Sequence, residues 1–387
     1  MQNFIFENPT KIIFGQGQIK RIGAEVKSHG RKALMVYGEG SIRKNGIYDR
    51  VVASMSEAGV SLVEFPGVRS NPLLSHTMKG ITLARREAVD VVLAVGGGSV
   101  IDTAKTIAMG VRAEHDIWDY FTRKEAIRGA LPVLTVATVS ASASEMNPAA
   151  VMTRDEGAEK FSIRSMHIQP KTSILDPTVL YTLPPSYSAY SAVDAISHML
   201  EGYFNNTAAD SPLQDRLVEA LTRTIMESTG IILQDPANYN ARATMMWSAT
   251  LAFNGLTSAG MGLISLPVHM IEHSLSALYD VPHGAGLSIL TPGWMDYAVG
   301  SNPKRFARFA REIFGVESRT EMEEAQEGIR RLKAWFSGIG SPTSLEEVRI
   351  PEGDIDKITA NAGRLAEVWQ LKDYTPEVIS DILRRCL

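Results

Sequence analysis

One aspartate and four histidines, spaced as neighbours on helices, are the residues best suited to chemistry in this sequence. Asp194 and His198 lie four residues apart, His269 and His273 repeat that spacing, and His283 closes the segment. Positions i and i+4 share one face of a helix. A carboxylate with neutral imidazoles suits a borderline divalent cation such as zinc or ferrous iron. These residue types and spacings predict a metal site.

The pattern leaves the ligand set open. The other four histidines are scattered through the first half of the chain, whereas these four fall within one stretch among apolar neighbours. A buried imidazole needs a polar partner, which favours a shared site over isolated core histidines. A catalytic metal keeps one position for water or substrate, so only some of the five side chains can be ligands. His269 and His273 lie one turn apart, and periodicity does not choose between them.

A run of three glycines predicts a phosphate-binding turn. Gly96-Gly97-Gly98-Ser99 follows a continuous apolar run at 90–95 and precedes a helical stretch. Backbone N–H groups at the start of a helix attract anions, and glycines let the backbone approach a pyrophosphate closely. The spacing is not the G-x-G-x-x-G fingerprint, so a tight strand-to-helix turn without a ligand is the alternative.

A second small-residue loop bears on the choice of coenzyme. Gly38-Glu39-Gly40-Ser41 ends an apolar strand, and Arg43 and Lys44 follow. A small residue with nearby cations admits a 2′-phosphate, which favours NADP(H) over NAD(H), whereas an acidic residue here binds ribose hydroxyls. Glu39 therefore argues against the NADP(H) preference. An ordinary solvated helix start is the alternative reading of Arg43 and Lys44.

The elements that must position these residues change character near residue 184. Before it, strands alternate with helices, which predicts a doubly wound α/β domain. The predicted strands are at 11–14, 33–37, 61–65, 90–95 and 132–138, with helices near 48–58 and 74–88. Beyond it the patterns are helical, at 212–234, 239–254, 263–279, 303–314 and 319–337. We therefore expect two domains, 1–184 and 185–387.

Bulk properties exclude several classes of protein. The 387 residues are 44% hydrophobic and 21% charged, with a net charge of −4 and no basic face, so nucleic acid is not an expected partner. No apolar stretch is long enough for a bilayer and no signal peptide is visible, which predicts a cytoplasmic enzyme without a membrane partner. Cys386 is the only cysteine, so an intrachain disulfide and a multi-thiolate metal site are excluded.

Taken together, three stretches resemble the iron-containing (group III) alcohol dehydrogenases, nearest the NADPH-dependent butanol dehydrogenase and broad aldehyde reductase branch. They are residues 96–100, 192–198 and 269–284, and the likeness extends over nearly the whole chain. The resemblance implies a Rossmann-like N-terminal dinucleotide-binding domain with a parallel sheet. It also implies an all-helical metal domain, as in dehydroquinate synthase-like enzymes, an active site in the cleft between them, and a homodimer.

Residue by residue, the resemblance implies a four-ligand metal site and a catalytic histidine. The ligands would be Asp194, His198, His269 and His283, holding iron or zinc, with His273 near substrate and nicotinamide. The implied coenzyme contacts are Gly38, Glu39, Gly40, Asn71, Gly97, Gly98, Ser99, Asp102, Thr138 and Lys160. Two positions depart from the family pattern: Ala143 replaces a usual glycine near the cofactor, and Glu39 replaces the middle glycine of a Tyr-Gly-Gly-Gly-Ser run.

The expected function is interconversion of small primary alcohols and aldehydes by hydride transfer with NADP(H), chiefly aldehyde reduction or butanol oxidation. One alternative is a non-redox metal enzyme, such as a lyase of the dehydroquinate synthase-like group; another is an NAD-linked polyol dehydrogenase. The lyase sites need Lys and Arg for an anionic substrate, whereas segments 139–152 and 252–268 are mostly small and apolar. The clustered ligands argue against a nucleotide-binding module without chemistry.

Overall fold

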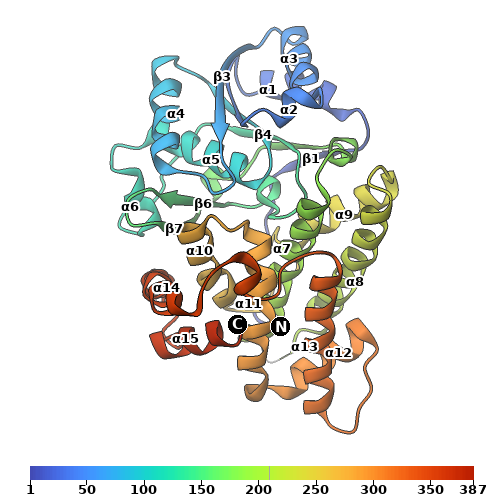
Figure 1. Ribbon diagram of the computed structural model, residues 1–387. Helices are drawn as coiled ribbons and strands as arrows, with labels where there is room; N and C mark the ends of the chain where they lie inside the picture. Colours follow the sequence, from blue (N-terminus) through green and yellow to red (C-terminus); the bar gives the residue numbers. More distant parts are fainter. Residues whose placement is uncertain (209) are drawn as a thin grey trace. The chain divides into compact units, whose positions relative to one another are not determined.

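The chain forms two compact units, which the computed structural model describes for residues 1–208 and 210–387 (Figure 1). One unit comprises Glu7–Leu183 and Asp235–Thr250; the other comprises Met1–Phe6, Pro184–Gln234 and Leu251–Leu387. The expected division at residue 184 therefore differs from these units in two segments. Met246 belongs to the core of the first unit, and the backbone N–H of Gln2 donates to the carbonyl of Gly260 within the second.

The first unit is built on a six-stranded parallel sheet in the order β1-β8-β5-β4-β2-β3, which confirms the predicted fold class. Its strands are β1 (Lys11–Phe14), β2 (Lys32–Gly38), β3 (Ser61–Val68), β4 (Val91–Gly96), β5 (Val133–Ala137) and β8 (Thr172–Leu175). Every residue of β4 and β5 is buried, as expected for central parallel strands covered on both faces.

Helices flank this sheet, and an antiparallel hairpin accompanies it. The helices of the unit are α1 (Ile22–Lys27), α2 (Ser41–Lys44), α3 (Ile47–Glu57), α4 (Leu74–Arg86), α5 (Gly98–Arg112), α6 (Ile117–Phe121) and α9 (Tyr239–Ala252), which reaches two residues into the second unit. The hairpin strands are β6 (Ala149–Arg154) and β7 (Glu159–Arg164). Neither the hairpin nor β8 was predicted from the sequence.

The order of the strands creates a point where the winding of the sheet reverses. From β2 the chain moves outward to the edge strand β3, then crosses back to β4 on the other side of β2. Tyr37 of β2 pairs with Val95 of β4, so Gly38 and Gly96 end these strands at the same level. Open α/β sheets bind ligands outside the carboxyl ends of strands at such a switch point.

The second unit is helical. Its helices are α7 (Pro185–Phe204), α8 (Pro212–Gln234), α10 (Pro267–Tyr279), α11 (His283–Ala298), α12 (Pro303–Phe314), α13 (Glu321–Gly338), α14 (Ile355–Trp369) and α15 (Pro376–Arg384). Proline occupies the first turn of α7, α10 and α12, where its missing N–H has no helical partner to lose. Helix α11 was not predicted, because Pro292 lies inside it. No helix among the described residues is long and apolar enough to cross a bilayer.

Candidate functional site

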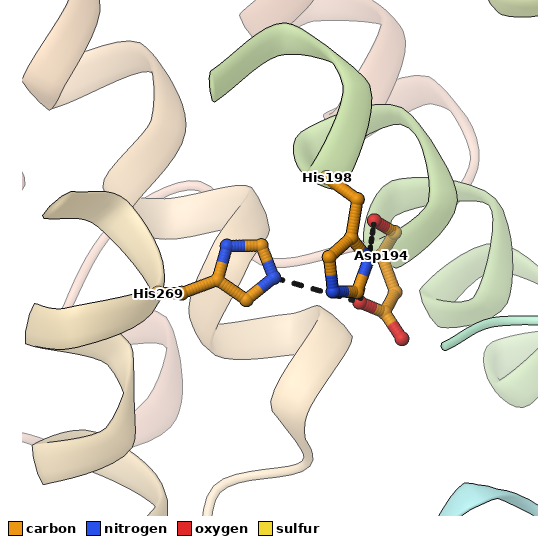
Figure 2. Close-up of side chains that lie close together, drawn as sticks. All are labelled: Asp194, His198 and His269. Atoms are coloured by element: carbon orange, nitrogen blue, oxygen red, sulfur yellow. Dashed lines mark hydrogen bonds and ion pairs between the residues drawn. The ribbon is translucent and has the colours of Figure 1, made fainter. Parts of the chain in front are cut away.

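Three of the predicted metal ligands lie together in the helical unit (Figure 2). Asp194 and His198 lie on α7, and His269 lies on α10. Each offers one ligand atom, and these atoms all lie within 4.8 Å of one another. The Nδ1 atom of His198 is 3.1 Å from Oδ1 of Asp194, and Nε2 of His269 is 3.9 Å from the same oxygen. All three residues are buried.

His283 faces the same carboxylate oxygen from a third helix. It is the first residue of α11, and its Nε2 atom lies 3.7 Å from Oδ1 of Asp194. Its side chain is 26% exposed, whereas that of Asp194 is 7% exposed. The fold thus brings one carboxylate and three imidazoles together from sequence positions up to 89 residues apart, counting from Asp194 to His283.

An unsatisfied polar atom indicates that this arrangement is fitted to a cation. The Nε2 atom of His269 is buried and has no hydrogen-bond partner among the described residues. Such an atom costs free energy unless something occupies the space it faces. A divalent metal accepts electron pairs from neutral imidazole nitrogens and carboxylate oxygens. The donor set therefore fits zinc or ferrous iron.

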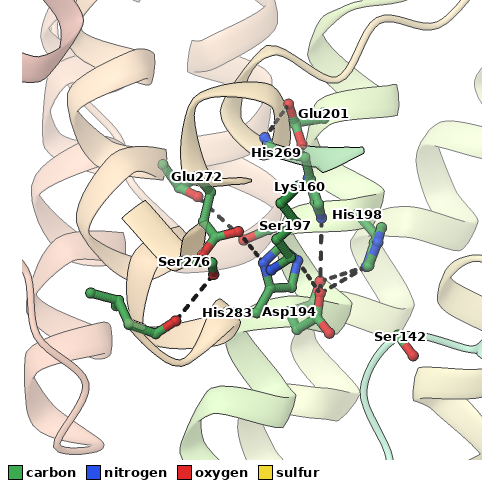
Figure 3. Close-up of polar contacts among 12 residues, drawn as sticks. Ser142, Lys160, Asp194, Ser197, His198, Glu201, His269, Glu272, Ser276 and His283 are labelled. Carbon is green, nitrogen blue, oxygen red and sulfur yellow. Dashed lines mark hydrogen bonds and ion pairs between the residues drawn. The ribbon is translucent and has the colours of Figure 1, made fainter. Parts of the chain in front are cut away.

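Two of the three imidazoles, those of His269 and His283, are backed by a carboxylate on the other side of the ring (Figure 3). Nδ1 of His269 is hydrogen-bonded to Oε2 of Glu201, and Nδ1 of His283 to Oε2 of Glu272. The acids are fixed in turn: the backbone N–H of Val268 donates to Glu201 at 2.5 Å. These bonds hold the proton on Nδ1 and direct the Nε2 lone pair inward.

The charges of the cluster depend on one another. Burial acts to raise the pKa of Asp194, but the charge and hydrogen bonds of His198, with those of His269 and His283, outweigh it and hold this pKa well below its usual value. Burial and the nearby charge of His269 lower the pKa of His198. Burial also opposes charge on His269, yet Glu201 and Asp194 prevail and raise its pKa to about 10. A metal ion at this centre would displace the second proton of His269 and free its Nε2 lone pair.

Neither Glu201 nor Glu272 was identified from the sequence. Both are almost completely buried on helices, with side-chain exposures of 2% and 0%. The sequence does carry a signal for them, because each is an acidic residue within an apolar helix. Glu201 lies three residues after His198, and Glu272 lies immediately before His273. A buried acid needs a hydrogen-bonding partner, and a nearby candidate ligand is the natural one.

Two aromatic side chains border the cluster within the helical unit. Phe253 stacks on His198 with ring centroids 4.1 Å apart. Trp369, the last residue of α14, meets His273 edge to face at 5.6 Å. His273 is buried, and its ring centroid is 5.8 Å from that of His283. Aromatic side chains therefore pack against the cluster beside the polar groups of Glu201, Glu272 and His273.

In the α/β unit, the glycine turn has the shape of a phosphate cradle. Gly97 caps α5, a 15-residue helix that begins at Gly98. A Cβ atom on Gly98 would lie 2.5 Å from Oγ of Ser142, and one on Gly97 would lie 2.9 Å from a methyl of Val139. Any side chain here would force its neighbours to move. The turn thus has no room for side chains at the start of a helix, where backbone N–H groups attract anions, and this fits a coenzyme pyrophosphate.

Other predicted coenzyme residues gather at the same edge of the sheet. Gly38 ends β2, Gly40 has a φ of 130°, and Glu39 between them is exposed. The backbone N–H of Thr138, just after β5, donates to the carbonyl of Gly96 at 3.0 Å. The neighbouring parallel strands β2, β4 and β5 thus end in these segments.

Asn71, Lys160 and Ser99 form hydrogen bonds with other protein groups. Nζ of Lys160 donates to Oδ1 of Asn71 at 3.2 Å, and both residues are buried. The hydroxyl of Ser99 donates to the carbonyl of Ser70, the residue before Asn71. Their predicted role as coenzyme contacts stays a prediction.

Asp102 is tied to the loop that lies on the glycine turn. Its Oδ1 accepts a hydrogen bond from Ser144 at 2.6 Å, and its Oδ2 accepts one from the backbone N–H of Val151 at 3.0 Å. Lys105, one turn further along α5 and fully buried, donates to Ser144 Oγ at 2.8 Å and to the carbonyl of Ala149 at 2.6 Å. Asp102 is thus an anchor of this loop, and Lys105 is a second anchor that sequence reasoning missed.

Ala143 in that loop adopts the conformation that glycine would adopt freely. Its φ and ψ are 51° and 21°, in the left-handed region, and it is buried. A non-glycine residue there carries a cost of about 1–2 kcal/mol. The anchors at Asp102 and Lys105 hold the loop against this cost.

Comparison with known proteins assigns the chain to a family. The family described as "Iron-containing alcohol dehydrogenase" matches residues 9–177, and "Fe-containing alcohol dehydrogenase family, C-terminal" matches residues 188–387. The chain belongs to the iron-containing alcohol dehydrogenase family. It is an oxidoreductase of a family whose members bind a nicotinamide coenzyme and a divalent metal. The resemblance recognised in the sequence is thereby confirmed.

Individual relatives match over almost their full length. A protein named probable NADH-dependent butanol dehydrogenase 1, from Bacillus subtilis, is 40% identical, and the match covers 100% of both chains. The crystal structure of NADH-dependent butanol dehydrogenase A from Thermotoga maritima is 45% identical, with a TM-score of 0.96 and coverage of 100% and 99%. The NADPH-dependent aldehyde reductase YqhD of Escherichia coli is 33% identical, covering 90% of this chain and 89% of its own.

Proposed function

We propose that this alcohol dehydrogenase reduces small aliphatic aldehydes, and oxidises the corresponding primary alcohols, with NAD(H) as coenzyme. The observation that carries the proposal is the convergence of Asp194 with three imidazoles beside apolar and aromatic side chains. Asp194, His198, His269 and His283 would hold the metal. An uncharged, weakly polar substrate suits such surroundings better than the anionic substrate of a lyase.

The metal ion, the coenzyme and the protein have different tasks. When bound, the divalent cation supplies Lewis acidity toward a carbonyl oxygen, and the nicotinamide coenzyme supplies the hydride. Glu201 and Glu272 keep the Nε2 atoms of His269 and His283 unprotonated and aimed at the centre. Phe253 and Trp369 exclude water and restrict the size of the substrate. His273, one turn after His269, would deliver a proton to the product oxygen from a ring nitrogen.

The choice of NAD(H) differs from the preference drawn from the sequence. The small residues at 38–41 and the cations Arg43 and Lys44 favoured NADP(H), and that preference was not confirmed. The two relatives of 40% and 45% identity are both named as NADH-dependent enzymes, whereas the NADPH-dependent YqhD is 33% identical. Glu39, exposed just after β2, supports this choice, because an acidic residue after an early strand of a dinucleotide fold can bind ribose hydroxyls.

Initial rates with C3 to C6 aldehydes test this function. We expect NADH oxidation to require aldehyde, to match it mole for mole, and to exceed the rate with NADPH. Chelation is expected to abolish the rate, and iron or zinc to restore it, because the four-ligand site holds the required cation. A lyase would turn over without net NADH consumption, and that result would exclude the proposal.

We also propose that the chain forms a homodimer through its N-terminal segment. Within the helical unit, Ile5 is 95% exposed and Leu263 is 80% exposed, and Phe4 and Phe6 are exposed as well. Contiguous exposed apolar side chains mark interaction surfaces. Sedimentation equilibrium would detect the dimer, and a monomer at micromolar concentration would exclude it.

The cytoplasmic location expected from the sequence stays a prediction.

A further inference from the structure

A compact group of two tyrosines, one arginine and one glutamate lies beside the end of β2. Nη2 of Arg43, on α2, donates to Oε2 of Glu64 at 2.6 Å and to the hydroxyl of Tyr37 at 2.7 Å. The hydroxyl of Tyr37 donates to Oε2 of Glu64, and that of Tyr48 donates to Oε1, each at 2.6 Å. The guanidinium also lies 3.8 Å from the centroid of the Tyr48 ring. We call these four residues the Glu64 cluster.

The cluster fixes the direction of the Arg43 side chain. An isolated ion pair as exposed as this one, at 49% and 39%, would be screened by solvent and would hold neither side chain firmly. Here Glu64 receives three donors and Arg43 is also stacked on an aromatic ring, so the geometry is defined from several sides. Burial acts to raise the pKa of Glu64, but the hydrogen bonds from Tyr37 and Tyr48, together with Arg43, outweigh it and lower that pKa. Glu64 is therefore negatively charged at neutral pH.

The position of the cluster connects it with the coenzyme. Glu64 pairs with Met35 across β2 and β3, and Tyr37 is the last residue before Gly38. Arg43 follows the same loop, at the switch point between β2 and β4. In dinucleotide folds an arginine near this strand end accommodates the 2′-phosphate of NADP. Arg43 has the right charge for that task, but its guanidinium is already bound.

The local charges oppose a 2′-phosphate as well. Two cations, Arg43 and Lys44, are balanced by two carboxylates, Glu39 and Glu64, so no net positive charge remains for a phosphate dianion. We infer that Glu64 is a specificity-determining residue, which binds Arg43 and thereby sets the preference for NAD(H) over NADP(H). This inference rests on the proposed function, because it needs a coenzyme site at the switch point.

Binding of nucleotide fragments tests the role of Glu64 without turnover. Titration calorimetry would measure the Kd of 5′-AMP and of adenosine 2′,5′-bisphosphate for wild type, Glu64→Gln and the double variant Arg43→Gln/Glu64→Gln. Gln keeps the size of Glu and one acceptor oxygen while removing its charge. Glu57→Gln, an exposed carboxylate at the end of α3, is the matched control.

We expect wild type to bind 5′-AMP more tightly than the bisphosphate. Glu64→Gln should bind the bisphosphate about tenfold more tightly than wild type, the effect of one charge-assisted hydrogen bond, with 5′-AMP affinity unchanged. Glu57→Gln should bind as wild type does, and the double variant should lose the gain. Thermal unfolding would verify that each variant is folded.

The remaining outcomes separate the two proposals. Three results would overturn the role of Glu64. Glu64→Gln could change the affinity for both nucleotides equally, or change neither affinity. The gain in bisphosphate affinity could also survive in the double variant. The coenzyme site would still stand in those cases, because 5′-AMP binds. Failure of folded wild type to bind either nucleotide would overturn the coenzyme site itself, and the inference with it.

Discussion

Replacing His198 by alanine is expected to remove the metal and with it nearly all turnover. The change deletes one of four proposed ligands and leaves Asp194 without its nearest imidazole, 3.1 Å away. We expect the metal content to fall below about one tenth of the wild-type value, because the affinity of the site for its metal ion depends on the complete ligand set. Loss of the Lewis acid should lower kcat/KM for aldehyde reduction by roughly 10³-fold or more. Elemental analysis and initial rates would measure both.

A matched control and a milder variant keep this prediction testable if His198→Ala folds poorly. His29→Ala removes an exposed histidine in the other unit and should change neither quantity. Glu272→Gln leaves all four proposed ligands in place but weakens the hold on His283, so metal affinity should fall roughly 10- to 100-fold. Normal metal content and full activity in a folded His198→Ala protein would contradict the proposed site.

Replacing Lys105 by methionine is expected to cause the largest loss of stability. The side chain is fully buried, and its ammonium group donates to Ser144, to Asn147 and to the carbonyl of Ala149. Methionine would leave these acceptors unpaired and would remove one of the two cations, Lys105 and Lys160, that act on the buried Asp102 carboxylate. Each buried acceptor left without a donor costs about 1–3 kcal/mol, so we expect a total loss of about 3 kcal/mol or more. Urea denaturation would measure the loss.

The dependence on pH gives a second test of Lys105. Burial lowers the pKa of this lysine to about 8, with Asp102 acting in the opposite direction, while an unfolded lysine has a pKa of about 10.4. Between these values the unfolded chain binds more protons at this position than the folded chain. Its contribution to the free energy of unfolding therefore rises with pH from about 8 to about 10.4, and Lys105→Met should lack that rise.

An exposed lysine provides the control for that variant. Lys124 is 71% exposed and lies 3.6 Å from Asp119, so Lys124→Met should change stability by about 0–1 kcal/mol at most. If Lys105→Met were as stable as Lys124→Met, the loop on the glycine turn would not depend on its anchor.

The parts of the fold with strong periodic patterns were predictable from the sequence. Buried runs gave the central strands, and the bounds of α8 (Pro212–Gln234) and α12 (Pro303–Phe314) agree with the predicted 212–234 and 303–314. The hairpin of β6 and β7 was not predicted, because its strands contain no long apolar run. Helix α11 was not predicted, because Pro292 interrupts its helical pattern. Proline is unfavourable inside an isolated helix, but tertiary packing of buried residues can override that preference.

The candidate site was predictable in its residues but not in its contacts. Spacing along one helix placed Asp194 beside His198, whereas only the fold brings His269 and His283 to the same oxygen. Glu201 and Glu272 could not be assigned, because a pairing between helices leaves no periodic mark in a sequence. The same limit applied to Arg43, whose binding to Glu64 depends on the pairing of β2 with β3.

The residues at Asp235–Thr250 have a practical consequence for engineering. They belong to the α/β unit, where Met246 fills the core and Thr250 donates to the buried carboxylate of Glu145 at 2.6 Å. A gene fragment truncated at residue 184 would lack this segment, and with it the core contacts of Met246 and the hydrogen bond to Glu145. Chimeras designed to exchange coenzyme specificity between relatives should therefore replace two segments together, Glu7–Leu183 and Asp235–Thr250, rather than the amino-terminal segment alone.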